Sequence, residues 1–151
     1  MNFWAPPAVT GAAAFWLANL SISATAMAAD YRHALGIRYV PMLVEAAAGG
    51  LVLSGVLTFM LLRRPSKTPG PNLLVKALLL GAATLVILTV GVEAPSKLAS
   101  GVDDAAHWLL VATIINLLRI LVLAATVGLV ADVGARRRGR HPGHGWSEAA
   151  K

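Results

Sequence analysis

The sequence predicts an all-α membrane protein, an antiparallel bundle of four transmembrane helices with both termini in the cytoplasm. Of its 151 residues, 57% are hydrophobic and only 13% are charged, which is about half the charged fraction of an average soluble domain. The mean hydropathy is +0.69. A chain with so little polar surface belongs in lipid, so its expected surroundings are the lipid bilayer of a bacterial inner (plasma) membrane.

Four apolar stretches follow one another, and each is long enough to cross roughly 30 Å of hydrocarbon. They cover residues 8–29, 39–62, 72–92 and 107–133. Proline and glycine residues between 65 and 71 separate the second span from the third. Short connections make consecutive helices antiparallel neighbours. Residues 1–134 are therefore the predicted transmembrane domain, and the basic segment 135–151 is predicted to be a disordered cytoplasmic tail.

The orientation follows from the lysines and arginines in the short loops. Basic residues gather in "RRPSK" (63–67) and "ARRRGR" (135–140), so both segments are expected to face the cytoplasm. The segment 93–104 has three acidic residues and one basic residue, and it is expected to face outward. The net charge of +6 is thus attributed to topology, and no nucleic-acid binding is predicted. The motif "ATAMAAD" (24–30) resembles a signal-peptide cleavage site, but no basic residue precedes Arg32, so a retained helix is expected.

Several classes of chemistry are excluded by the residues present. The chain has no cysteine, which excludes disulfides, CxxC redox motifs and thiolate metal sites. It has no serine nucleophile elbow, P-loop or dinucleotide fingerprint, and no histidine lies inside the spans to ligate haem. No cofactor is predicted, and the sequence leaves open whether the protein is an enzyme.

Two ionisable residues, Glu45 and Arg119, lie inside predicted spans, where charges are costly and rarely accidental. Asn116 shares a helix face with Arg119, and Asn19 lies midway along the first span. A rise of 1.5 Å per residue places Glu45, Asn116, Asn19 and Arg119 about 9, 13, 15 and 18 Å below the outer boundary, respectively. We therefore expect Arg119 to pair with Glu45, and Asn116 and Asn19 to complete the cluster. This cluster either fixes the helix register or forms the floor of an outward-facing ligand pocket.

Four further polar residues are expected at the outer mouth of the bundle: His33, Glu93, Asp103 and His107. Histidines and carboxylates together suggest a metal site, but the irregular spacing on separate loops is a weak signal. No metal site is predicted.

Small residues in the second span predict a close helix contact. Gly50 and Ser54 form a small-xxx-small pair, with Gly49 and Gly55 beside them. Packing inside the chain is favoured over a homodimer face. The sequence leaves open both a homodimer and a subunit of a larger membrane complex.

Spaced single residues in 31–119 resemble a group of small, uncharacterised bacterial membrane proteins with four spans, distantly similar to the anthrone-oxygenase-like family. The pattern consists of His33, Arg38, Pro41 and Glu45, then Pro95, Leu98, Gly101, Asp103, Asn116 and Arg119. This chain departs from the pattern at Ser96, where the group often has a histidine, and at Leu117, where it often has an aromatic residue. The resemblance implies the same helical bundle and the same polar cluster.

Three functions remain open at this point. The first is a non-catalytic protein that binds a small amphipathic or aromatic ligand or serves as an accessory subunit. The second is a cofactor-independent enzyme acting on an aromatic or quinone-like lipid, with Glu45, Asn116 and Arg119 orienting its oxygens. The third, ranked last, is a small proton-coupled transporter that uses Glu45.

Overall fold

The computed structural model describes residues 5–63 and 72–139, which are almost entirely helical and include no strand. The elements follow the chain in the order α1 (Ala5–Ser23), α2 (Ala26–Ala34), α3 (Tyr39–Arg63), α4 (Leu73–Leu88), the π-helical turn η1 (Thr89–Glu93), α5 (Ala94–Ala99) and α6 (Ala105–Gly139). Three segments are long and apolar enough to cross a membrane, and a bent pair of helices could make a fourth crossing. The predicted all-helical, multi-pass class is confirmed.

Helix α3 agrees with the predicted second span to within one residue at either end. The outward faces of α3 and α4 carry large apolar side chains, which suits a helix that faces lipid. They include Leu51, Val52, Val56, Leu79, Val86 and Ile87.

The third span is longer than predicted, because the helix does not end at residue 92. It continues through η1 and α5, so the apolar segment runs from Leu73 to Ala99. Pro95 lies in the first turn of α5, directly after the π-helical turn. A wide π turn is one way in which a helix absorbs a local change in its hydrogen bonding and continues. As a result, Glu93 belongs to the span and not to an outward loop.

The first predicted span, 8–29, does not form one straight helix. Helix α1 ends at Ser23, and α2 then leaves at an angle of 86°. The break lies where hydroxyl side chains take over backbone hydrogen bonding, since Ser23 Oγ donates to the Leu20 carbonyl and Thr25 Oγ1 accepts from the Ala28 N–H. Ser and Thr favour such helix ends and starts.

Helix α6 extends beyond the predicted fourth span at its C-terminal end. It reaches Gly139, so residues 135–139, predicted to be disordered, are helical. Most of the predicted tail, 140–151, lies outside the described residues, as do residues 64–71 of the basic loop.

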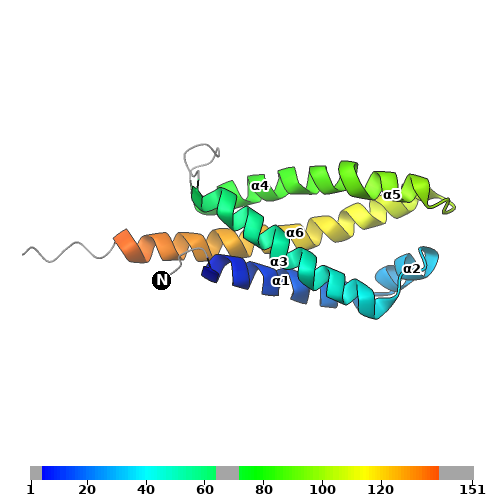
Figure 1. Cartoon of the computed structure of the whole chain (residues 1–151), viewed down its shortest axis with the longest axis horizontal. Coiled ribbons are helices and arrows are strands. Elements are labelled where there is room, and N and C mark those ends of the chain that lie inside the picture. Colours follow the sequence, from blue (N-terminus) through cyan, green and yellow to red (C-terminus); the bar gives the residue numbers. More distant parts are fainter. Residues whose placement is uncertain (1–4, 64–71, 140–151) are drawn as a thin grey trace, which may run out of the picture.

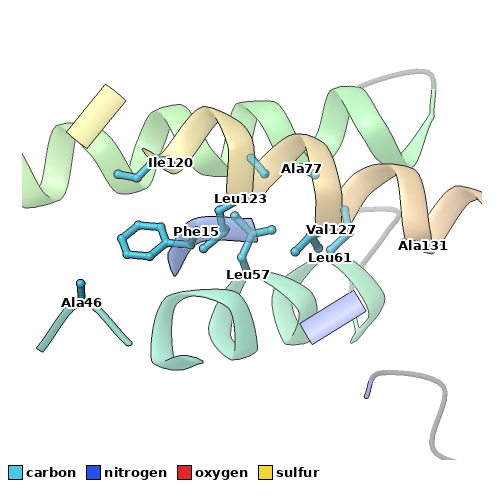
Figure 2. Close-up of a cluster of buried hydrophobic side chains, with 10 residues drawn as sticks. Phe15, Ala46, Leu57, Leu61, Ala77, Ile120, Leu123, Val127 and Ala131 are labelled. Atoms are coloured by element: carbon cyan, nitrogen blue, oxygen red, sulfur yellow. The ribbon is translucent and has the colours of Figure 1, made fainter. Parts of the chain in front are cut away.

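Helix α6 is the central helix. In its most apolar window 44% of the residues are buried, compared with 17% for α3 and 11% for the third span. It packs against α4 on one side and α1 on the other, and α3 crosses obliquely over α1 (Figure 1). The core between them is apolar, and Figure 2 shows Phe15, Leu57, Leu61, Leu123 and Val127 converging there.

The small residues of α3 act inside the chain, as predicted. Ser54 is buried and its Oγ donates to the Ala8 carbonyl of α1 at 2.7 Å. A Cβ placed on Gly50 would lie 2.8 Å from the Phe15 ring, so only glycine allows this approach. Gly49 and Gly55 face open space within 4 Å and take no part in this contact.

Candidate functional site

Arg119 of α6 is held by two amide oxygens. Its Nη1 donates to Asn19 Oδ1 of α1 at 2.7 Å, and its Nη2 donates to Asn116 Oδ1, one turn earlier on α6, at 2.5 Å. The guanidinium also lies 5.7 Å from the centre of the Phe15 ring. Asn19 is 3% exposed and Asn116 is 9% exposed. The structure thus brings together three of the four residues expected in the polar cluster.

The carboxylate that joins this network is Glu93, and the expected Glu45–Arg119 pair is wrong. Asn116 Nδ2 donates to Glu93 Oε1 at 3.0 Å. Glu45 is exposed and forms no ion pair with any residue in the described part of the chain. Glu93 takes the place expected for Glu45 because the third span is longer than predicted. The helix continues past residue 92 and places Glu93 beside Asn116 of α6.

Lys97 completes the network on the side away from Arg119. Its Nζ lies 3.1 Å from Glu93 Oε2, one helical turn earlier, and Lys97 is only 6% exposed. The same ammonium lies 5.2 Å from the centre of the Tyr31 ring on α2. Tyr31 in turn packs against Trp108, with ring centres 6.1 Å apart. Both oxygens of Glu93 are therefore occupied, and the network is linked to α2.

Sequence reasoning missed Lys97 and Tyr31. A glutamate four residues before a lysine is the spacing and order that favour an ion pair on a helix. Glu93 and Lys97 have this spacing, and the signal was readable once the segment was assigned to a helix. Nothing in the sequence places Tyr31 of α2 against Lys97, since this contact depends on the bend after Ser23.

A cavity of about 350 Å³ lies beside the network, at the end of the molecule covered by α2. This volume is within the roughly 300–1,000 Å³ typical of small-molecule sites. Its polar lining comes from α1, α2, α3, η1 and α6 and consists of Asn19, Ser23, Tyr31, Arg32, Glu45, Glu93 and Arg119. Phe15, Ile22, Met42 and Ile115 contribute apolar lining. Glu45 and Arg119 thus border the same cavity without pairing.

Two residues that line this cavity each carry an N–H donor that has no acceptor among the described residues. Asn19 Nδ2 and Arg119 Nε are buried and have no hydrogen-bond partner within the described structure, and both residues line the cavity. The hydroxyls of Thr58 and Thr89 are also buried without a partner, but a hydroxyl rotates freely and can adjust to a nearby carbonyl. Amide and guanidinium N–H groups are fixed by the plane of the side chain. A buried donor without an acceptor costs about 1–3 kcal/mol, so an acceptor that reached either atom from the cavity would be stabilised there.

Arg32 holds α2 at the edge of the cavity. Its Nη1 donates to the Ser23 carbonyl at the end of α1 at 2.9 Å, and its guanidinium lies 5.0 Å from the centre of the Tyr39 ring. These contacts span the bend between α1 and α2 and the start of α3. Arg32 therefore fixes the position of α2 as one wall of the cavity.

The residues expected at the outer mouth do not form one group. His33, Asp103 and His107 are exposed, and of the four only Glu93 lines the cavity. The His107 ring packs edge-on against Trp108, 4.8 Å away. Within residues 5–63 and 72–139, no group of three or more His, Cys, Asp or Glu side chains is arranged to hold a metal ion.

Comparison with protein-family models, curated proteins and solved structures gives no match for this chain.

Proposed function

We propose that this protein binds a small amphipathic molecule in the cavity beside Arg119. We further propose that it is an inner-membrane protein whose four spans form an antiparallel bundle with both termini in the cytoplasm. In this topology the bent pair α1–α2 is one span, and α2 and the cavity lie toward the outer side. The basic residues of 63–67 and 135–140 support this orientation, because such residues favour the cytoplasmic side.

The observation that carries the binding proposal is that two residues lining a cavity of about 350 Å³ each keep a donor, Asn19 Nδ2 and Arg119 Nε, without a partner in the described structure. A network that only fixed the helix register would gain most from satisfying all of its members. Here both oxygens of Glu93 have partners, whereas Asn19 and Arg119, which line the cavity, each keep an N–H donor without a partner in the described structure. Apolar residues on the other walls, including Phe15 and Met42, suit the body of an amphipathic ligand.

The alternative of an enzyme acting on an aromatic lipid is not favoured by the position of Asn116. Its amide oxygen accepts from Arg119 and its amide nitrogen donates to Glu93. Both groups are engaged inside the protein and Asn116 does not line the cavity, so Asn116 positions Arg119.

We further propose kinship with the group of small bacterial four-span proteins distantly similar to the anthrone-oxygenase-like family. Asn116 and Arg119, which belong to the resemblance, are in contact in the network, and Glu45 borders the same cavity as Arg119.

The proposed function is tested by the small molecules that co-purify with the protein in mild detergent, measured by native mass spectrometry. We expect the wild-type protein to retain a small molecule and Asn19→Leu to lose it. The matched control is Thr58→Val, which removes another unpartnered buried polar atom far from the cavity lining. Circular dichroism of each variant checks that the helices are intact. Equal retention by Asn19→Leu and Thr58→Val, or a wild type that retains nothing, would contradict the proposal.

A further inference from the structure

The charges around the cavity do not balance. The lining includes two cations, Arg32 and Arg119, and two carboxylates, Glu45 and Glu93. Lys97 adds a third positive charge, because it is buried against Glu93. The cavity and its direct ion-pair partner therefore carry one positive charge in excess. In a segment surrounded by hydrocarbon such an excess is costly unless an anion offsets it.

Two of these cations, Arg32 and Arg119, have no carboxylate partner among the described residues, and Arg119 is the one that also keeps a buried donor without an acceptor. Both oxygens of Glu93 are taken, one by Asn116 and the other by Lys97. Arg119 itself donates only to the neutral amide oxygens of Asn19 and Asn116, and its Nε has no partner among the described residues. A buried guanidinium is usually paired with a carboxylate or phosphate. Arg119 has two neutral amide oxygens in place of an anion, and its side chain also borders the cavity.

We propose that the ligand is a monoanionic amphipath, a carboxylic acid in its ionised form on an apolar body, bound as the counter-ion of Arg119. This inference rests on the proposed function and specifies the ligand class of the same cavity. The carboxylate accepts from Arg119 Nε and from Asn19 Nδ2, the two donors that lack partners. Both atoms are buried within residues that line the cavity, so the two side chains must turn toward the carboxylate on binding. The apolar body contacts Phe15, Met42 and Ile115.

Glu45 gives the proposal its sharpest test. It lines the same cavity, it is exposed, and it has no ion-pair partner in the described segments. A carboxylate headgroup near Arg119 therefore experiences repulsion from Glu45. Removing this charge favours an anionic ligand and leaves a neutral ligand of the same shape unaffected.

The experiment compares decanoate with methyl decanoate, which keeps the carbonyl acceptor and the chain but has no charge. Binding to the purified full-length protein in mild detergent is measured by native mass spectrometry at several probe concentrations. We expect the wild type to bind decanoate at least about tenfold more tightly than the ester, the difference expected for a charge-assisted contact. Glu45→Gln should tighten decanoate binding by about threefold or more and leave the ester unchanged.

Asn19→Asp should have the opposite effect, because it removes the Nδ2 donor and supplies Arg119 with a carboxylate from the protein itself. We expect decanoate to bind about tenfold more weakly to this variant. Thr58→Val, remote from the cavity, should bind both probes as the wild type does.

Equal binding of ester and decanoate to the wild type would overturn the anionic ligand and leave the proposed function standing. Decanoate binding that Glu45→Gln weakens or leaves unchanged would also overturn it, because the headgroup would then lie away from Glu45 and Arg119. If neither probe binds while the purified protein retains a neutral molecule, the inference fails alone. If neither binds and nothing is retained, the proposed function fails with it.

Discussion

The two asparagines that hold Arg119 should respond in opposite ways to the same substitution. Asn→Asp at either position turns a neutral acceptor of Arg119 into a carboxylate and so creates an ion pair. The second polar atom of each asparagine differs, however. Asn19 Nδ2 has no partner in the described structure, whereas Asn116 Nδ2 donates to Glu93 Oε1 at 3.0 Å.

The magnitude follows from that difference. Asn19→Asp gains the ion pair and loses no hydrogen bond, so we expect the free energy of unfolding to stay level or rise by about 1 kcal/mol. Asn116→Asp gains the same pair, but it loses a hydrogen bond to a charged group and sets two carboxylates against each other. These two losses lower the free energy of unfolding by about 2–3 kcal/mol relative to Asn19→Asp.

The assay is reversible unfolding in mixed micelles, in which sodium dodecyl sulfate is titrated into protein held in dodecyl maltoside. Helix content is followed by circular dichroism, and both variants are compared with the wild type. Adding Glu93→Gln to Asn116→Asp removes the carboxylate repulsion and should recover part of the loss. If Asn116→Asp proved as stable as Asn19→Asp, Glu93 would not be in contact with Asn116, and the network described above would be wrong.

Three further predictions concern the helix contacts, the ion pair and the topology. Gly128→Ala should lower the free energy of unfolding by about 1–2 kcal/mol, because its Cβ would lie 2.7 Å from a backbone atom of α4. Gly55 has open space around it, so Gly55→Ala should raise the free energy of unfolding by up to about 1 kcal/mol. Equal effects of the two substitutions in the same titration would refute this packing. Lys97→Met should cost about 1–3 kcal/mol by leaving Glu93 without its cation, and an unchanged unfolding curve would contradict a buried pair. Because the chain has no cysteine, Asp103→Cys carries a single thiol, which an impermeant maleimide should label in intact cells; labelling only after permeabilisation would reverse the proposed orientation.

The parts of the fold that could be predicted from the sequence are those that depend on hydropathy alone. Helix α3 is an apolar run with Glu45 as its one charged residue before Arg63, and Arg38 and Arg63 mark its two ends, so both ends were predictable. The contact of Gly50 and Ser54 with α1 was predictable as well, because small residues at this spacing let two helices approach closely.

The bend after α1 and the extension of the third span could not be predicted in this way. Ala, Ser and Thr continue past Ser23 with little change in hydropathy, and the bend depends on which hydroxyl caps the next helix. In "EAPSK" the charges and the proline resemble a loop, yet the π-helical turn carries the helix through Pro95.

The error over Glu45 has a different physical origin. Residues on two helices can lie at the same depth in a membrane and still face different directions, because depth depends on the rise along the helix and facing depends on rotation about it. Depth alone selected Glu45 as the partner of Arg119. The structure places Glu45 at the edge of the shared cavity and Glu93 in the network.

The polar residues therefore separate into two parts with different physical roles. Around Glu93, one carboxylate oxygen accepts from Asn116 of α6 and the other from Lys97 one turn later, and this part joins the third span to the central helix. Around Arg119, two planar donors have no partner among the described residues, and both belong to side chains that line the cavity. Asn116 belongs to both parts, since one side of its amide contacts Glu93 and the other contacts Arg119. Because Asn116 couples the two parts, movement of Arg119 toward the proposed anion would also disturb the contact between Asn116 and Glu93 of the third span.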